Sequence, residues 1–285
     1  MLKQNLFPIV VGCLSAFLTT LLIVLTKRWH GHWTNDHTEG VQKFPSVPTP
    51  RIGGLAILVG VFASTSILDE SLSDLILPIL IAGLLPFFFG LMEDFTGQVS
   101  VNSRLLATVA GVVLAILLTR VHLNHLDIPA VDLLMSWWPF GVFVTIIGIS
   151  GITNAVNILD GFNGLSSGVA IIISFFLAFM AFETNDYLLA SFSLMIAASL
   201  LGFALLNYPF GKIFLGDAGA YFVGFLLGWI ALLLPVRNEE ISPWASLLVC
   251  GYPVVEVLYS MARRMKIQIK ATGCPDNLHM HSLIK

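Results

Sequence analysis

The chain consists largely of long apolar runs separated by short polar stretches. A membrane-spanning helix needs about 20 predominantly apolar residues, and runs near this length recur throughout the sequence. Proline and glycine inside the runs are compatible with membrane helices, because neighbouring helices can satisfy the freed backbone groups. The pattern predicts an all-α, polytopic transmembrane helix bundle of about nine helices. Their predicted cores are 6–26, 52–68, 75–92, 104–119, 138–156, 164–182, 187–206, 218–235 and 243–262.

Composition supports a chain that lies mostly in the bilayer. Hydrophobic residues make up 56% and charged residues 11% of the sequence, whereas soluble domains carry about 25% charged residues. We therefore expect residues 1–285 to form a single membrane-embedded domain without soluble modules. A net charge of −3 provides no basic surface for nucleic acid. The first apolar run precedes Lys27 and Arg28 without a cleavage-site pattern, which predicts a retained helix.

The distribution of basic residues predicts the orientation. Nine spans place alternate connections on the same side of the membrane, and 11 of the 14 Lys and Arg residues then fall on one side. The positive-inside rule makes that side cytoplasmic. The amino terminus is therefore expected outside, and the carboxyl-terminal tail inside.

Five polar clusters interrupt the apolar pattern, and all five fall on the predicted cytoplasmic side. A carboxylate next to an apolar helix end needs a partner, and four acids sit at such ends. These acids are Glu93, Asp94, Asp160 and Asp217. The clusters are 48–54, 93–94, 154–164, 207–219 and 276–281.

Carboxylates that converge from different helices repel one another unless a cation lies between them. Oxygen ligands suit a hard ion such as Mg²⁺, with Mn²⁺ as an alternative, and Mg²⁺ commonly uses one or two carboxylates plus substrate phosphates. Helix capping is the alternative role for any single acid. Glycines beside Asp160 and Asp217 permit close backbone approach to a ligand, and a helix start can hold phosphate. Two further residues, His279 and His281, follow Asp276 on the same side and suit hydrogen bonding or proton transfer.

These motifs resemble those of the polyprenyl-phosphate N-acetylhexosamine 1-phosphate transferases, which belong to glycosyltransferase family 4. The resemblance covers residues 45–285 in a consistent order. Residues 48–54 look like the first cytoplasmic motif, and residues 154–164 look like the Asn-x-x-Asn-x-x-Asp-Gly-x-Asp-Gly motif. Residues 213–217 are similar to the metal-binding motif, and residues 276–281 to the histidine motif. Residues 42–44 and 252–264 look closer to the branch for lipopolysaccharide O-antigen and cell wall polymers than to the peptidoglycan branch.

The resemblance implies a role for each matching residue. Asp217 would bind the metal ion, and Asp94 would orient the lipid phosphate or accept its proton. Asp160 and Asn163 would hold the uridine end of the substrate. The remaining positions are Glu93 in the acidic pair, Asn157 and Asn207 near the nucleotide and diphosphate, His279 and His281 in the histidine loop, and Arg51, Arg104 and Lys212 against phosphates. For each of these three basic residues, a membrane anchor is the alternative.

The implied reaction transfers N-acetylhexosamine 1-phosphate from a UDP-sugar to polyprenyl (undecaprenyl) phosphate, giving polyprenyl-diphospho-sugar and UMP. It is the first membrane step of cell-surface glycan synthesis. The resemblance also implies the bacterial inner membrane and a homodimer. The sequence departs from the family at Glu93, which replaces an Asp, and at Asn163, which replaces an acid. Relatives usually continue beyond the position of Lys285.

The sequence leaves two alternatives to the transferase function open. A secondary transporter would use Asp160 and Asp217 for ion coupling, but transporter sites favour the bilayer midplane and internal repeats. A catalytically inactive relative is the other alternative, because Asn163 lacks the charge of the acid that it replaces.

Overall fold

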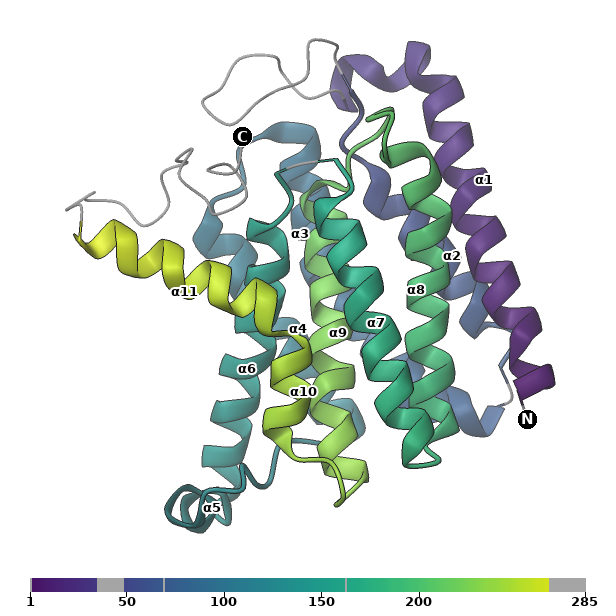
Figure 1. Ribbon diagram of the computed structural model, residues 1–285. Helices are drawn as coiled ribbons and strands as arrows, with labels where there is room; N and C mark the ends of the chain where they lie inside the picture. The colour runs from purple at the N-terminus through teal and green to yellow at the C-terminus, as the bar shows by residue number, and fades with distance from the viewer. Residues whose placement is uncertain (1, 35–48, 69, 162, 267–285) are drawn as a thin grey trace.

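The protein is a bundle of helices, described by a computed structural model that covers residues 2–34, 49–68, 70–161 and 163–266 (Figure 1). These residues form 11 helices and no strand, which confirms the all-α class. The helices are α1 (Leu2–Thr34), α2 (Gly53–Thr65), α3 (Glu70–Thr96), α4 (Val101–Thr119), α5 (Pro129–Met135), α6 (Trp138–Ile158), α7 (Leu165–Glu183), α8 (Tyr187–Asn207), α9 (Gly216–Arg237), α10 (Pro243–Val249) and α11 (Gly251–Lys266).

Helix α9 forms the centre of the bundle. It packs mainly against α3 and α6, and also against α2, α7 and α10. Its aromatic residues Phe222, Phe225 and Trp229 are completely buried. Helices α1 and α4 lie farther out and expose large apolar side chains, such as Leu25 and Leu117. An apolar interior together with an apolar outer surface is the arrangement that a surrounding bilayer requires.

Among the residues that the structure describes, seven helices are long and apolar enough to cross a membrane, and the chain is a multi-pass membrane protein. They are α1, α3, α4, α6, α7, α8 and α9. Local sequence sets several of their ends. The Ser100 side chain accepts a hydrogen bond from the Ser103 N–H at the start of α4, and Asp186 does the same for Leu189 at the start of α8. Such side chains satisfy N–H groups that have no partner within the helix.

Two of the nine predicted cores do not form helices of full span length. The run 52–68 yields α2, which has only 13 residues. The run 243–262 is divided into α10 and α11 at Cys250, and α11 leaves the bundle at an angle (Figure 1). Gly251 and Pro253 explain the break, because glycine is a poor helix former and proline lacks an N–H donor.

Three predicted boundaries also shift, and each shift affects the site. Helix α3 extends to Thr96, so Glu93 and Asp94 lie in its last turn and not in the following connection. Asn157 similarly lies within α6. Asp217 lies in the first turn of α9 and not before it.

Candidate active site

The backbone segments that precede α2 and α9 pair with each other at one end of the bundle. The N–H groups of Gly53 and Gly54 donate to the carbonyl oxygens of Phe214 and Leu215, at 3.0 and 2.9 Å. The Phe214 N–H donates to the Pro50 carbonyl at 2.8 Å. This pairing places residues 50–54 beside the start of α9, although more than 150 residues separate the two segments.

Glycines make this close approach possible. A Cβ at Gly54 would overlap the backbone of Gly219, and a Cβ at Gly90 on α3 would lie 2.8 Å from the backbone of Asp217. Gly216 has φ +75°, a conformation that disfavours residues with a Cβ. Helices α2, α3 and α9 therefore meet backbone to backbone at this end.

Two carboxylates from other segments cap the start of α9. Asp94, at the end of α3, accepts hydrogen bonds from the N–H groups of Asp217 at 2.8 Å and Ala218 at 2.9 Å. Asp160, which follows α6, accepts from the Gly216 N–H at 3.1 Å. A helix start carries unpaired N–H groups and a partial positive charge, so both favour carboxylates at this position.

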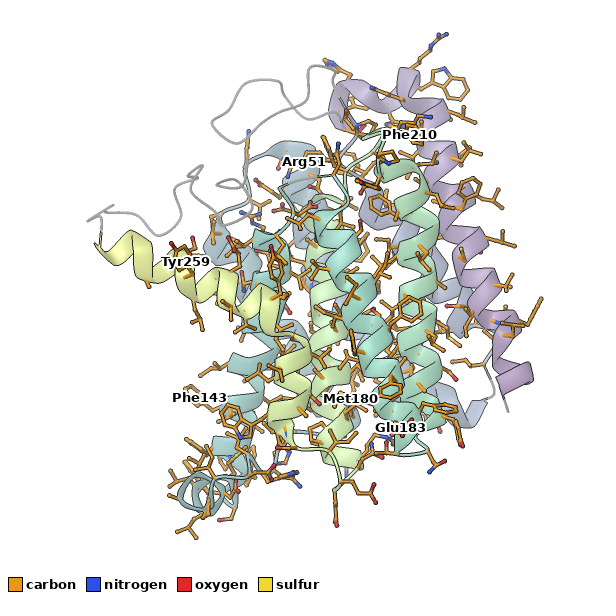
Figure 2. All side chains as sticks on the ribbon, viewed as in Figure 1. Arg51, Phe143, Met180, Glu183, Phe210 and Tyr259 are labelled. Atoms are coloured by element: carbon orange, nitrogen blue, oxygen red, sulfur yellow. The ribbon has the colours of Figure 1, made fainter. Side chains whose placement is uncertain are left out.

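Asp217 itself forms ion pairs with two arginines. Arg104 Nη1, from the first turn of α4, contacts Asp217 Oδ2. Arg51 Nη2 lies 3.5 Å from Asp217 Oδ1, and Arg51 Nε lies 3.9 Å from Asp94 Oδ1. The site thus combines three acids and two arginines. It lies at the end of the bundle where Arg51 and Phe210 are labelled in Figure 2, opposite the end that carries Glu183. We call this group of five side chains the carboxylate–arginine cluster.

Burial changes the acidity of the cluster. Loss of hydration raises the pKa of Asp160 above its ordinary value, to about 6, because burial penalises the charged carboxylate. The Arg51 charge and the hydrogen bond from Gly216 act in the opposite direction and lower the pKa. The Asp160 carboxyl therefore has a pKa closer to neutral pH than that of an exposed aspartate.

Asn207 connects the turn before α7 to the loop before α9. Its Oδ1 accepts from the Gly164 N–H at 2.8 Å, and its Nδ2 donates to the Ile213 carbonyl at 2.8 Å. Asn207 is only 3% exposed, so these bonds occupy most of its polar capacity. This position favours an architectural role over the substrate contact expected from the sequence.

The other predicted residues lie around the cluster at different distances from it. The Glu93 carboxylate accepts from the Val99 N–H at 2.7 Å and so holds the turn between α3 and α4. Asn157 is half-buried near the end of α6, and the exposed Asn163 lies beside Gly211. Lys212 is exposed, with Nζ 5.0 Å from the centre of the Phe210 ring. The predicted residues His279 and His281 lie outside the described part of the chain.

One residue of the site, Tyr221, is not among those predicted from the sequence. Its ring centre lies 5.8 Å from Arg104 Cζ, and its hydroxyl donates to Asn154 Oδ1 at 3.4 Å. The spacing contains the signal that was overlooked. Tyr221 follows Asp217 by four residues, and residues at this spacing share a helix face.

The donor chemistry at Asp217 fits a magnesium ion that substrate phosphates complete. Within residues 2–34, 49–68, 70–161 and 163–266, no group of three or more His, Cys, Asp or Glu side chains is arranged to hold a metal ion. Mg²⁺ does not need such a group, because one or two carboxylates plus phosphates and water commonly suffice. Asp217 is the best placed carboxylate, since Asp94 and Asp160 accept hydrogen bonds from the fixed backbone of α9, whereas the partners of Asp217 are arginine side chains that can move.

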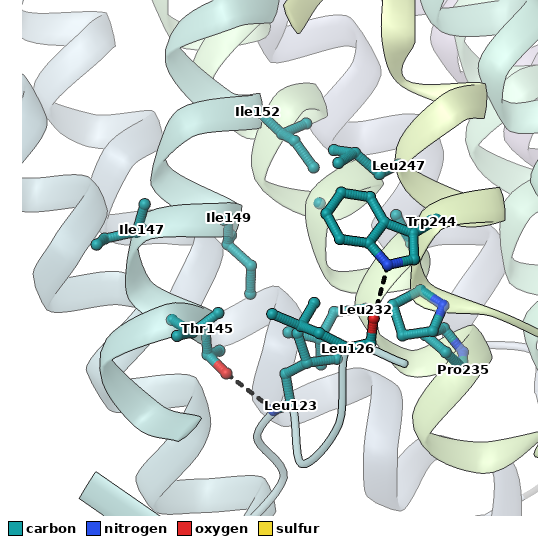
Figure 3. A pocket seen from close by; sticks show the side chains of 15 residues that line it. Leu123, Leu126, Thr145, Ile147, Ile149, Ile152, Leu232, Pro235, Trp244 and Leu247 are labelled. Carbon is teal, nitrogen blue, oxygen red and sulfur yellow. Dashed lines mark hydrogen bonds between the residues drawn. The ribbon is translucent and has the colours of Figure 1, made fainter. Parts of the chain in front are cut away.

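A separate apolar cavity of about 210 Å³ lies between α6, α9, α10 and the segment before α5 (Figure 3). Its lining contains no ionisable residue. Trp244 Nε1 donates to the Leu126 carbonyl at 2.6 Å, and the Leu123 N–H donates to Thr145 Oγ1 at 2.9 Å. The cavity therefore lacks the groups for phosphate chemistry. The carboxylate–arginine cluster has such groups and is the candidate active site.

The fold and the cluster define a multi-pass membrane protein with a charged side-chain cluster at one end of an apolar bundle. A family model described as glycosyl transferase family 4 matches residues 76–235, more than half of the sequence. The chain belongs to this family. The matched range includes Asp94, Asp160 and Asp217.

Two bacterial relatives align with nearly the whole chain. One, from Bacillus subtilis (strain 168), is named "Probable undecaprenyl-phosphate N-acetylglucosaminyl 1-phosphate transferase". It is 28% identical over 285 residues, which cover 99% of this chain and 78% of the relative. The other, from Escherichia coli (strain K12), is named "Undecaprenyl-phosphate alpha-N-acetylglucosaminyl 1-phosphate transferase". It is 26% identical over 287 residues, which cover 99% and 77% of the two chains.

Proposed function

We propose that this protein transfers N-acetylhexosamine 1-phosphate from a UDP-sugar to polyprenyl phosphate, giving polyprenyl-diphospho-sugar and UMP. The observation that carries the proposal is the carboxylate–arginine cluster around the start of α9 in a member of glycosyl transferase family 4. The names of the relatives make undecaprenyl phosphate the first acceptor to test and UDP-N-acetylglucosamine the first donor.

The chemistry requires little covalent participation by the protein. An oxygen of the lipid phosphate would attack the phosphorus atom that carries the sugar, and the bond to the UMP oxygen would break. Because the nucleophile is ionised near neutral pH, catalysis depends mainly on positioning and charge neutralisation. Arg51 and Arg104 supply two cations at the start of α9, and guanidinium groups pair well with phosphate oxygens.

Asp217 would hold the metal ion, Mg²⁺ or alternatively Mn²⁺. When bound, the ion would supply charge neutralisation at the diphosphate. The hydrogen bonds of Asp94 to the Asp217 and Ala218 N–H groups support a positioning role for Asp94, which fixes the helix start that carries the metal ligand. Asp160 does the same through Gly216. The roles of Asn157 and Asn163 at the nucleotide, and the proton-accepting role of Asp94, stay predictions.

The orientation is part of the proposal. In the topology predicted from the sequence, the end that carries the cluster is on the same side as 11 of the 14 Lys and Arg residues, which supports a cytoplasmic active site in the bacterial inner membrane. The amino terminus would then lie outside. A cluster at one end of the bundle also favours an enzyme that works at the membrane surface over a transporter with a midplane site. The single domain over residues 1–285 and the homodimer stay predictions.

Release of UMP tests the proposed function. Purified full-length protein in detergent, given UDP-N-acetylglucosamine, undecaprenyl phosphate and Mg²⁺, is expected to release UMP in step with formation of the lipid-linked sugar. Omission of the lipid phosphate or addition of EDTA should each reduce the rate at least about a hundredfold. A transporter or an inactive relative would release no UMP with any UDP-N-acetylhexosamine, and that result would refute the proposal.

A further inference from the structure

Both carboxylate oxygens of the proposed metal ligand already contact a cation of the protein. Arg104 Nη1 contacts Asp217 Oδ2, and Arg51 Nη2 lies 3.5 Å from Asp217 Oδ1. The two contacts differ in their surroundings. The Arg104 side chain is 13% exposed, whereas that of Arg51 is 30% exposed. Arg104 therefore neutralises Asp217 in the more dehydrated environment, where ionic attraction is stronger.

The Arg104 guanidinium lies between a carboxylate and an aromatic ring. The Tyr221 ring centre is 5.8 Å from Arg104 Cζ, within the range of a cation–π interaction. Tyr221 is 1% exposed, and its hydroxyl donates to Asn154, so the ring is fixed in place. Arg104 Nε is buried and has no hydrogen-bond partner within the described part of the chain. The guanidinium is thus held near Asp217 with one donor still unsatisfied.

We propose that Arg104 is an internal cation that competes with the divalent metal ion for Asp217. In the metal-free protein Arg104 neutralises the carboxylate, and metal binding releases the guanidinium toward phosphate oxygens of the substrate. This inference rests on the proposed function for the identity of the metal and of the phosphates. It deepens that function, because it couples metal binding to phosphate binding through one side chain.

The competition follows from geometry and charge. A metal ion on Asp217 Oδ2 would occupy the place of Arg104 Nη1, and two cations cannot share that oxygen without strong repulsion. A guanidinium can pair with phosphate as well as with carboxylate, so the released group has a second partner only when substrate is present. Because the coupling between metal binding and phosphate binding is reciprocal, phosphate should also strengthen metal binding by attracting Arg104 away from Asp217.

The test is direct Mn²⁺ binding to the purified, substrate-free full-length chain, measured by electron paramagnetic resonance. Arg104→Gln is expected to bind Mn²⁺ about tenfold more tightly than the wild type, because the competing charge is gone. Transfer at saturating metal should nevertheless be slower. Arg104→Met removes the same charge and keeps an apolar stem against Tyr221, so it tests the effect if the Gln variant does not fold.

Two further variants act as controls. Lys212→Gln removes the same charge from an exposed position at the same end and should change Mn²⁺ affinity less than about twofold. The double variant Arg104→Gln with Asp217→Asn should show no gain in Mn²⁺ affinity, because it lacks the Asp217 carboxylate that would bind the ion.

Unchanged or weaker Mn²⁺ binding by both folded Arg104 variants would overturn the inference, and so would absent binding in every variant. The proposed function is judged separately from UMP release by the wild-type preparation. If the wild type releases UMP but Arg104→Gln shows no gain in Mn²⁺ affinity, only the competition between Arg104 and the metal ion is refuted. If the wild type releases no UMP but Arg104→Gln binds Mn²⁺ more tightly, the competition is supported and the proposed reaction is refuted.

Discussion

Replacing Asp217 with asparagine is expected to reduce sugar-phosphate transfer at least about a hundredfold, because the change removes the charge that would hold the metal ion. The amide has nearly the same size as the carboxylate, and the hydrogen bond from the Asp217 N–H to Asp94 belongs to the backbone. The start of α9 should therefore keep its structure. The measurement is the initial rate of UMP release at saturating substrates, together with the melting temperature of the variant in detergent.

Glu239→Gln is the matched control for this variant. It also neutralises an acid, but Glu239 is exposed beyond the end of α9 opposite to Asp217, so the transfer rate should stay within about twofold of wild type. If Asp217→Asn retained more than about a third of the wild-type rate while folded, Asp217 would not bind a catalytic metal ion.

Gly216→Ala is expected to be the most destabilising single change at the site. Gly216 has φ +75°, which costs an L-residue roughly 1–2 kcal/mol. Its new Cβ would also overlap the Arg51 carbonyl oxygen and lie 2.7 Å from Asp94 Oδ2. Overpacking of this kind costs about 1–3 kcal/mol more. We expect the free energy of unfolding to fall by about 2–5 kcal/mol and transfer to be lost.

The chain supplies its own control for the backbone contribution. Gly97 also has positive φ, +62°, but a Cβ there would have no atom within 4 Å. Gly97→Ala should therefore cost only the conformational part, about 1–2 kcal/mol. Thermal unfolding in detergent compares the two variants. Equal melting temperatures would mean that the contacts of α9 with Arg51 and Asp94 are loose, contrary to the arrangement described above.

The sequence pattern was sufficient to predict a helix bundle and to predict that the acids lie at the same end of it. Asp94, Asp160 and Asp217 each follow or begin an apolar run, and alternating spans must place those ends together. The pattern failed where length alone was the criterion. Residues 52–68 are apolar enough for a span, yet only Gly53–Thr65 are helical. Pairing with the segment before α9 fixes the start of the helix, and residues 66–68 form a turn after its end.

The detailed connections of the site could not be predicted from spacing. Nothing in the sequence indicates that Asp94 accepts from the N–H groups of α9 or that Arg104 pairs with Asp217. These contacts depend on the relative rotation and height of helices that are far apart in sequence. Asn207 shows the same limit, because its two loop contacts result from tertiary packing.

Residues from separate segments meet at one end of the bundle, and we propose that this end faces the cytoplasm. Single cysteines can test it in a chain whose natural cysteines, Cys13, Cys250 and Cys274, are replaced by serine. Gln98→Cys and Lys212→Cys report on the exposed surface at the site end, and Glu239→Cys reports on the opposite end. A membrane-impermeant maleimide applied to intact and permeabilised bacterial cells measures on which side each thiol lies.

We expect Gln98→Cys and Lys212→Cys to react only after permeabilisation, whereas Glu239→Cys should react in intact cells. Labelling of Gln98→Cys and Lys212→Cys from opposite sides of the membrane, or of both from outside, would contradict it.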